Sequence, residues 1–388
     1  MAGTPSNHMT GWLPAPDRKA SLWQLATLFL RLGVTAFGGP AAHIAMMEDE
    51  VVNRRRWLDR QRFLDLLGMA NLLPGPSSSE LAIYIGQSQA GWAGLLLGGA
   101  CFILPAALLT ATIAWAYVRF GSLPQAAGIL YGIRPVVVAI ILQALRRLGQ
   151  TALKTKFLMM IAIGAAAASL AGFGPVWILL CCGVVMLAKR NAERLRGLPA
   201  LFGFVPTAAI ITQSLGSLFL AFLKLGAVVF GSGYVLVAFL RADLMDRLHW
   251  LTEKQLLDAV AVGQITPGPV FSTATFIGYI LAGGKGAVLA TVAIFLPAFF
   301  LVAFTGPLLP RLRKSKIVFA LLDGVNAGSL GLMLAVVLFL ARAAILDLIT
   351  ALAAIGSATF LLRFKFNPTW LILAGAVLGI VYSAPHVR

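Results

Sequence analysis

Long apolar runs alternate with short polar loops along this chain, and this pattern restricts its fold more than any other feature. Most runs approach the ~20 residues that a helix needs to cross a ~30 Å hydrocarbon core. Of the 388 residues, 59% are hydrophobic, 39 more are glycine and only 12% are charged, about half the usual ~25%. These values exclude a soluble globular enzyme, a disordered chain and a coiled coil. The sequence therefore predicts an all-α polytopic membrane protein, with runs at 22–47, 91–118, 126–145, 157–171, 173–188, 207–238, 286–306, 317–341, 344–362 and 368–383.

Two further apolar segments, 63–90 and 256–283, are interrupted by proline and glycine, so we expect broken or re-entrant helices there. The runs 157–171 and 173–188 are short and closely spaced around Gly172-Phe173-Gly174-Pro175, which predicts a tight helical hairpin. Residues 1–20 are polar and predict a tail without a cleaved signal peptide.

The second half of the chain repeats the first. Shifting by 193 positions pairs Arg31 with Lys224 and Asp65 with Asp258. The same shift matches Phe-Gly at 37–38 with 230–231, Trp-Leu at 57–58 with 250–251, and Pro-Gly-Pro at 74–76 with 267–269. After one residue is dropped, a shift of 192 pairs Leu-Pro at 104–105 with 296–297. Because Gly, Pro, Trp and Asp align in one register, the pattern indicates a tandem duplication. It predicts a first repeat at 21–188, a basic linker at 189–206 and a second, inverted repeat at 207–388.

The charges of the loops predict how the repeats are oriented in the membrane. In the first half, successive loops carry five, one, four and no Lys or Arg, and the half ends with four. The corresponding loops of the second half carry three, four, one and two, and the last segment carries one. From the second loop onward the basic loops are in antiphase, so the positive-inside rule predicts two inverted repeats of about five crossings each.

Two observations disagree with this topology. Arg18 and Lys19 would hold the N-terminus in the cytoplasm and push the basic residues 54–62 outside. The loop 241–254 is also more basic than an outside loop should be, although three acids accompany its charges. A first segment that bends back at Gly38-Gly39-Pro40 removes the first conflict, so the side of the N-terminus and the crossing of 21–47 stay open.

The net charge of +17 does not indicate nucleic-acid binding here, because Lys and Arg cluster in loops between apolar runs. The three cysteines lie inside apolar stretches, two of them adjacent, and fit neither a disulfide framework nor a metal site. The four histidines are scattered. We therefore expect no metal and no cofactor.

Each half has two Gly/Pro interruptions at corresponding places. Proline removes an intrahelical hydrogen bond, so a break frees backbone N–H groups, which survive at membrane depth only in protein or beside a polar cavity. A helix that restarts after Pro-Gly-Pro directs its positive N-terminal end at that cavity and favours anions. A single break would be an ordinary kink, but four in register predict a transport site at the midplane. The residues concerned are Gly38, Gly39, Pro74, Gly75, Pro76, Ser77 and Ser78 in the first half, and Gly231, Ser232, Pro267, Gly268, Pro269, Ser272 and Thr273 in the second.

Three cations and one amide complete the predicted substrate-binding residues. Arg31 and Lys224 lie inside the first run of each half, where a cation usually faces a partner or a water-filled path; snorkelling to the interface is the alternative. Arg134 and its counterpart Asn326 begin another run, where an anion-facing donor and an interfacial side chain are equally compatible with the pattern.

Acids close to the breaks are few. Glu80 follows the first Pro-Gly-Pro, and it is a candidate for proton coupling or a first-turn acid that stabilises the helix N-terminus. Asp65 and Asp258 recur with Trp57 and Trp250, which we interpret as structural interfacial helices.

The motifs resemble the chromate ion transporter family. The resemblance rests on the duplicated Phe-Gly-Gly-Pro and Phe-Gly-Ser-Gly elements, on Leu-Leu-Pro-Gly-Pro-Ser, on Thr-Pro-Gly-Pro-Val-Phe-Ser-Thr, and on Ile-Phe-Leu-Pro-Ala-Phe. It covers roughly residues 20–385 and is to the long, two-domain bacterial members. The resemblance implies chromate efflux and resistance, sulfate as a competitor, and about ten helices in inverted halves. The first half departs from the repeat at residues 77–80, so the halves need not share the site equally.

These patterns lead to a secondary oxyanion exporter of the bacterial inner membrane, with chromate as the first substrate. Expelling a dianion from a negative interior is favourable by about 4.6 kcal/mol per 100 mV, so export needs no ATP, and no Walker-type loop is present. The alternatives are a transporter or exchanger of sulfate or another oxyanion and, from another class, a membrane-embedded hydrolase, whose usual motifs are absent. The expected partners are the oxyanion and the lipid bilayer, and a homodimer is compatible with the sequence.

Overall fold

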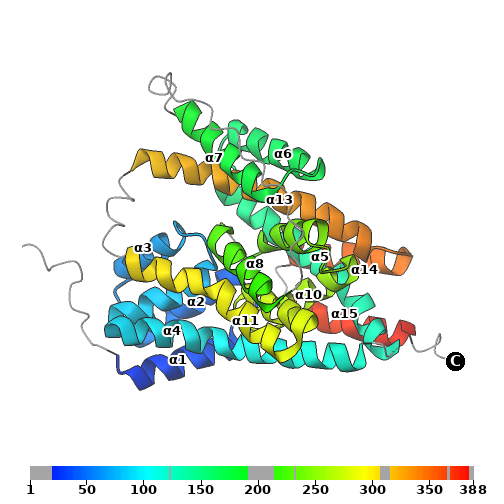
Figure 1. The fold of residues 1–388 in the computed structure, drawn as a ribbon, viewed down its shortest axis with the longest axis horizontal. Coiled ribbons are helices and arrows are strands. Elements are labelled where there is room, and N and C mark those ends of the chain that lie inside the picture. The colour runs from blue at the N-terminus through cyan, green and yellow to red at the C-terminus, as the bar shows by residue number, and fades with distance from the viewer. Residues whose placement is uncertain are drawn as a thin grey trace, which may run out of the picture.

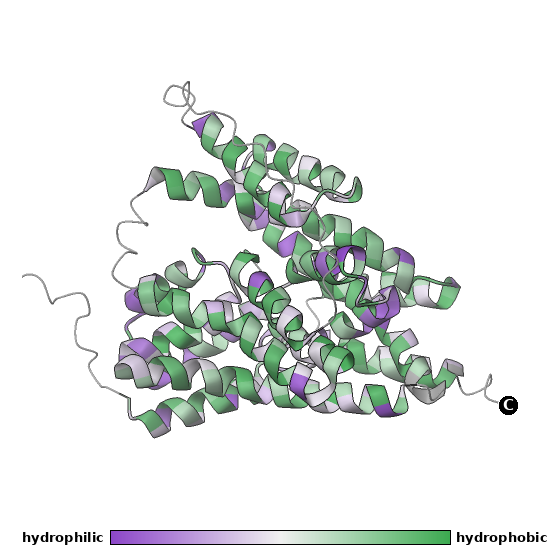
Figure 2. Cartoon of the chain, in the orientation of Figure 1, coloured by the Kyte–Doolittle hydropathy of each residue, from purple (hydrophilic) through white to green (hydrophobic). Residues whose placement is uncertain are grey.

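The computed structural model describes residues 20–121, 124–190, 214–230, 233–305, 315–364 and 368–383. Within these ranges the chain forms fourteen α-helices and no strand, so the all-α prediction is confirmed (Figure 1). Four helical stretches are long and apolar enough to cross a membrane: Ser77–Phe120, Ala127–Ala152, Val270–Thr305 and Ile317–Ala344. Hydrophobic residues predominate along the helices (Figure 2), and many large apolar side chains are exposed, among them Trp23, Phe304 and Leu348. This outer surface is that of a polytopic membrane protein.

In the described residues the two halves form the same elements in the same order, except that the second half has the additional short helix η3. The first half contains α1 (Leu22–Thr35), α2 (Pro40–Glu48), η1 (Asp49–Arg54), α3 (Arg60–Ala70), α4 (Ser77–Phe120), α5 (Pro124–Ala152), α6 (Lys156–Leu170) and α7 (Pro175–Arg190). The second contains α8 (Leu215–Val228), α9 (Leu236–Leu240), η2 (Arg241–Arg247), α10 (Glu253–Ile265), η3 (Val270–Ser272), α11 (Thr273–Thr305), α13 (Lys316–Ala344), α14 (Leu348–Arg363) and α15 (Pro368–Ser383). The predicted tail and linker lie almost entirely outside the described residues.

Unusual backbone conformations recur with the repeat. Both η1 and η2 are π-helices, and each is followed by a residue with φ +52, Arg56 in one half and His249 in the other. The first helix of each half has 14 residues, about 21 Å, which is too short to cross the hydrocarbon core. In the first half, α1 ends before Gly38 and Gly39, both with positive φ. The first apolar run therefore bends at the position that the sequence left open.

The helices α4 and α11 are each two helices joined by a sharp turn. Non-helical dihedral angles occur at Ala90-Gly91 in α4 and at Ala282-Gly283 in α11. Gly86 and Gly94 lie so close that a side chain on Gly86 would collide with the carbonyl oxygen of Gly94. Eight residues span about 12 Å along a straight helix, so the chain must fold back on itself here. The broken helices predicted at 63–90 and 256–283 are therefore present.

The halves are interlocked through their last helices. The predicted hairpin, α6 and α7, packs on α13 of the second half, while α14 and α15 pack on α5 of the first. Glycines allow this close approach: Gly132 on α5 touches the backbone of Gly375 on α15, and Gly324 on α13 touches that of Cys182 on α7. Each half therefore completes its packing with helices of the other.

Equivalent helices run in opposite directions. In Figure 1, α4 ends on the side where α15 lies, whereas α11 ends on the opposite side, near the beginning of α1. The second segments of α4 and α11 pack together, with Gly99 against Phe299. A two-fold axis that relates two antiparallel helices is perpendicular to them, so one half is inverted relative to the other, as the loop charges predicted. The side of the N-terminus stays a prediction.

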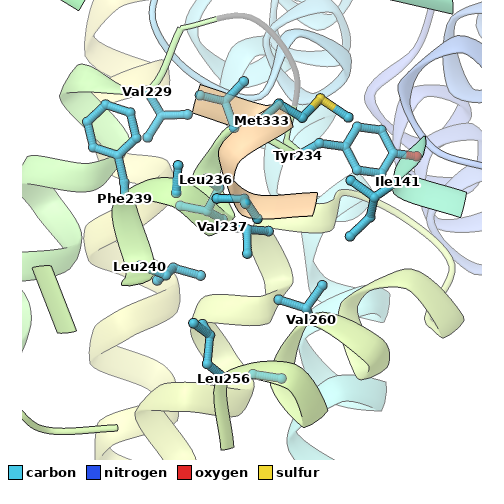
Figure 3. Close-up of a cluster of buried hydrophobic side chains, with 14 of the residues drawn as sticks. Ile141, Val229, Tyr234, Leu236, Val237, Phe239, Leu240, Leu256, Val260 and Met333 are labelled. Carbon is cyan, nitrogen blue, oxygen red and sulfur yellow. The ribbon is translucent and has the colours of Figure 1, made fainter. Parts of the chain in front are cut away.

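Buried apolar side chains of the second half fill the centre of the molecule. Figure 3 shows Val229, Leu236, Phe239, Leu240, Leu256 and Val260 packed with Ile141 of α5 and Met333 of α13. The ring of Tyr234 lies at the edge of this cluster, and its hydroxyl group points away from it. This core packs the short helix α9 against α13, and Tyr234, which precedes α9, lies beside Gly39 of the first break.

Candidate anion-binding site

The two Pro-Gly-Pro turns meet the opposite half at equivalent places. The backbone N–H of Gly75 donates to the carbonyl oxygen of Val229 at 2.8 Å, and that of Gly268 donates to Ala36 at 2.9 Å. Val229 and Ala36 directly follow the first helices of their halves, one residue before the Phe-Gly elements. All four predicted breaks are therefore brought together in two crossed pairs. The two turn glycines have φ +138 and +87, which a side chain would strain.

These two hydrogen bonds change the interpretation of the turns. The sequence predicted that the breaks would offer free N–H groups to an anion, but the N–H groups of Gly75 and Gly268 are bonded within the protein. Gly268 also packs against Gly33 and Ala106, and Gly75 against Glu80. The turns therefore act as joints between the halves, and Gly75 and Gly268 do not offer their N–H groups to an anion. Each proline turn leads directly into the next helix, with Pro76 preceding α4 and Pro269 preceding η3.

Polar side chains follow the first turn. The hydroxyl oxygen of Ser78 lies 3.3 Å from Nδ1 of His43, and Nε2 of His43 lies 3.0 Å from the carbonyl oxygen of Ala36. A carbonyl can only accept, so Nε2 carries the proton, and Nδ1 of the neutral ring accepts from Ser78. Ser79 and Glu80 are fully buried, and their side-chain oxygens have no hydrogen-bond partner among the described residues. Ser77 begins α4.

The second turn has hydroxyl groups in place of an acid. Thr273 donates to the carbonyl oxygen of Val270 at 2.7 Å, and Thr110 of α4 donates to Ser272 at 3.4 Å. Both Ser272 and Thr273 are buried. The two turns therefore share their backbone geometry but differ in chemistry, as residues 77–80 predicted.

A cavity of about 320 Å³ opens beside the first break. Residues Phe37 to Ala42 form one wall, and Gln143 and Arg147 of α5 form another, with Tyr234, Gln264 and Thr369 completing the lining. Arg147 forms no ion pair with an acid in the described chain, and Nε2 of Gln264 is buried there without a hydrogen-bond partner. An unneutralised guanidinium and an unused amide donor beside a glycine-rich break suit a small anion.

Arg31 and Lys224 form ion pairs away from this cavity. Arg31 pairs with Glu50 of η1, and Lys224 pairs with Asp243 of η2 at 2.8 Å. Arg54 also pairs with Glu50, and Arg247 also pairs with Asp243, each from four residues further along the chain. Burial alone would raise the pKa of Glu50, but hydrogen bonds from Arg55 and Arg31 outweigh it and hold the pKa below its ordinary value. Lys224 and Asp243 line a different cavity, of about 720 Å³.

Arg134 is paired as well. Its guanidinium donates to Asp258 at 2.9 and 2.7 Å, and the hydroxyl group of Tyr117 donates to the other carboxylate oxygen at 2.9 Å. Asp258 is 0% exposed, and residues 256–263 of α10 are buried throughout. The interpretation of α10 as an interfacial helix is therefore wrong, because a buried cation of the other half neutralises its acid. Asn326 lies half-buried on α13, while Gly231 and Ser232 lie outside the described residues.

Several residues of the site escaped sequence reasoning. Arg147 belongs to a basic loop that the topology argument used as a membrane-side marker, and His43, Tyr234 and Gln264 lie outside the motifs. No histidine lies near Ser78 along the chain, but the fold brings His43 to it. This pair lacks an orienting acid and is buried, so it does not match the arrangement of a hydrolase. In the described part of the chain, no three His, Cys, Asp or Glu residues are grouped to hold a metal ion.

Comparison with known proteins supports the resemblance. The family model described as Chromate transporter matches residues 23–187 and 216–380, one match in each half. The chain is 36% identical to the Chromate transport protein of Cupriavidus metallidurans, over 93% of both chains. It is 32% identical to the Probable chromate transport protein of Synechococcus elongatus, over 93% of this chain and 96% of that one. It is 35% identical to the Chromate transport protein of Pseudomonas aeruginosa, over 82% and 81%. No solved structure matches the chain.

Proposed function

The chain belongs to the chromate transporter family, and from this premise we propose that it exports chromate from the cytoplasm across the inner membrane of a bacterium. The observation that carries this proposal is the cavity beside the first break, where Arg147 faces Gly38 and Gly39 without an acid to neutralise it. Its volume of about 320 Å³ accommodates a tetrahedral dianion with several waters, since a water occupies about 30 Å³.

The proposed driving force is the membrane potential. Moving two negative charges out of a negative interior releases about 4.6 kcal/mol per 100 mV, so chromate leaves without ATP. The proposed movement is a rocking of the two inverted halves about their crossed turns. The reciprocal bonds at Gly75 and Gly268 support this, because each joins one half to the other at an equivalent point.

Sulfate is the second candidate substrate. Like chromate it is a tetrahedral dianion, and a guanidinium with amide donors binds both through the same hydrogen bonds. We therefore propose that sulfate competes for the cavity. Family membership favours a transporter over an enzyme, and the hydrolase alternative has no accessible nucleophile among the described serines 78 and 79.

The test is chromate uptake into everted membrane vesicles that contain the full chain. Export in the cell corresponds to uptake here, and a potential, positive inside the everted vesicles, should drive it. We expect Arg147→Gln to lower the initial rate at least ~10-fold, since one charge-assisted hydrogen bond contributes about 1.5–3 kcal/mol. Arg146→Gln is the matched control. Arg146 is the preceding residue and is exposed like Arg147, but it does not line the cavity.

Three results would contradict the proposal. Vesicles without chromate accumulation would remove the function itself. Equal rates in Arg147→Gln and Arg146→Gln would remove the cavity as the binding site. Sulfate uptake that chromate does not inhibit would make sulfate the substrate.

A further inference from the structure

Glu80 is a buried acid that no cation in the described part of the chain neutralises. Its side chain is 0% exposed, and neither carboxyl oxygen has a hydrogen-bond partner within the described residues. The other buried acids there, Glu50, Asp243 and Asp258, each pair with an arginine or lysine. An ionised carboxylate buried without a partner is among the most costly groups in a protein. The neutral acid is therefore the stable form of Glu80 in this conformation.

Glu80 lies where the two halves are joined. It follows the first Pro-Gly-Pro turn, and its carboxyl group packs so closely on Gly75 that a side chain there would collide with it. The N–H of Gly75 is bonded to Val229 of the second half, and Ala298 of α11 lies beside the same glycine. A movement of one half relative to the other therefore changes the surroundings of the carboxyl group.

A short chain of buried polar groups runs from the start of α4, next to Glu80 in the sequence, to the wall of the cavity. Ser78, two residues before Glu80, donates to His43, and His43 donates to the carbonyl oxygen of Ala36. Ala36 directly precedes Phe37 and Gly38, which line the cavity. The side chains of His43 and Ser78 are 1% and 2% exposed, so bulk water screens the path between cavity and acid only weakly.

We propose that Glu80 is the proton-binding site of the transporter and that it carries one proton together with each dianion; this rests on the proposed function. Two negative charges repel strongly where water is excluded, so an ionised Glu80 opposes an anion in the cavity and a protonated Glu80 does not. Proton and anion therefore favour each other's binding, and this coupling is reciprocal. The carboxylate takes its proton from water on the side where the anion enters and returns it on the side where the anion leaves. Each cycle then moves one net negative charge out of the cell, half of what the dianion alone would carry, so the membrane potential still drives export.

The groups around Glu80 do not supply an alternative proton carrier. On its own helix Tyr84 bonds to Thr305 of α11 at 2.9 Å, and on α2 the ring of His43 is held in one tautomer by Ala36. From α8 and α11 the described neighbours of the turn are the backbone of Val229 and the side chain of Ala298. At the second turn Ser272 and Thr273 stand in place of the acid. One carboxyl group predicts one proton per anion.

The experiment measures proton movement with chromate in liposomes. The purified full chain is reconstituted with a pH-sensitive dye inside, valinomycin and potassium clamp the voltage, and chromate is added outside at about pH 8. For the wild type we expect chromate uptake to acidify the lumen by about one proton per chromate. Glu80→Gln mimics the protonated acid, so it should exchange radiolabelled chromate but produce no acidification.

Two further variants keep the test decisive. Glu80→Asp retains a titratable group and should retain the acidification at a lower rate. Glu48→Gln removes a half-buried acid of α2 that pairs with Arg60, and it should behave as the wild type. Because protonated chromate would carry protons through every variant alike, Glu80→Gln also measures that contribution.

Each outcome decides the proposal. Acidification that disappears in Glu80→Gln and returns in Glu80→Asp supports it. Chromate transport by the wild type without acidification overturns it, as does acidification that persists in Glu80→Gln, and in both cases the exporter function stands. A wild type that moves no chromate removes the exporter function, and the proton site falls with it.

Discussion

The two halves of the molecule share their joints but not their chemistry. The turn glycines, the π-helices and the acid–base clusters at Glu50 and Asp243 occur in both halves. The buried pair of His43 and Ser78 and the buried acid Glu80 belong to the first half, and the position equivalent to His43 in the second half is the buried Leu236. Likewise Arg147 corresponds to Phe339. The duplication therefore supplies a symmetric frame, and the proposed substrate site lies on one side of it.

The physical reason is that the frame needs both copies. Each Pro-Gly-Pro turn bonds to the opposite half, and the last two helices of each half pack on the other. Each half takes part in both hydrogen bonds between the halves, at Gly75 and at Gly268, so both halves must keep the geometry of these turns. One anion, in contrast, needs only one set of charged groups along its path. Variants at equivalent positions test this difference directly.

The largest effect is expected at the turn glycines. Gly75→Leu and Gly268→Leu should each abolish chromate transport while the protein still inserts into the membrane, because φ is positive and a side chain would collide with Glu80 or Ala106. Vesicle uptake and protein amount in the membrane are measured together. Gly164→Leu is the control, since no atom lies within 4 Å of a Cβ there. Transport at the wild-type rate in either turn variant would contradict the shared role of the joints.

A smaller, asymmetric effect is expected at the repeated aspartates. Asp258→Asn leaves Arg134 without its acid in the interior and should lower the free energy of unfolding by about 3–5 kcal/mol. Asp65→Asn changes a half-buried acid of α3 and should lower the free energy of unfolding by no more than about 1 kcal/mol. Thermal unfolding in detergent compares them. Equal losses of unfolding free energy in the two variants would show that the two aspartates have the same structural role in both halves.

The next effect should be equal in both halves. Glu50→Gln and Asp243→Asn each remove the acid of a cluster whose cations are partly exposed, so each should cost about 1–2 kcal/mol of unfolding free energy. Because the pKa of Glu50 is held below its ordinary value of 4.5, its contribution is complete above that pH and is lost as the pH falls through the lowered pKa. The fall of the unfolding free energy with decreasing pH should therefore be less steep in Glu50→Gln than in the wild type. A loss of unfolding free energy in only one of the two variants would show that the two clusters are not energetically equivalent.

The smallest effect is expected at an exposed pair between the halves. Arg190 of α7 and Asp323 of α13 lie 3.4 Å apart, and both are about half exposed. Asp323→Asn should change the unfolding free energy by less than about 1 kcal/mol and leave transport unchanged. A double-mutant cycle with Arg190→Gln measures the pair directly. A coupling above that value would show that charge, besides the glycine contacts, holds the interlocked helices.

Sequence reasoning predicted the frame, whereas the substrate-binding residues that it named stay a prediction. The turns at Gly75 and Gly268 were located because proline and glycine break helices wherever they occur, which is a local property. Arg31 and Lys224 were recognised as equivalent, but their partners Glu50 and Asp243 were not. Gly75 and Gly268 were expected to bind an anion through N–H groups that the opposite half uses.

By itself the sequence determined that the protein is helical, embedded in a membrane, duplicated and broken at four corresponding places, because hydropathy and backbone breaks act over a few residues. Only the tertiary structure decided which charges are neutralised. Arg134 meets Asp258 from 124 positions away, while among the described residues Glu80 pairs with no cation and Arg147 with no acid. Such pairing depends on distances through space between segments of different halves, and these distances follow from the interlocked packing of the helices.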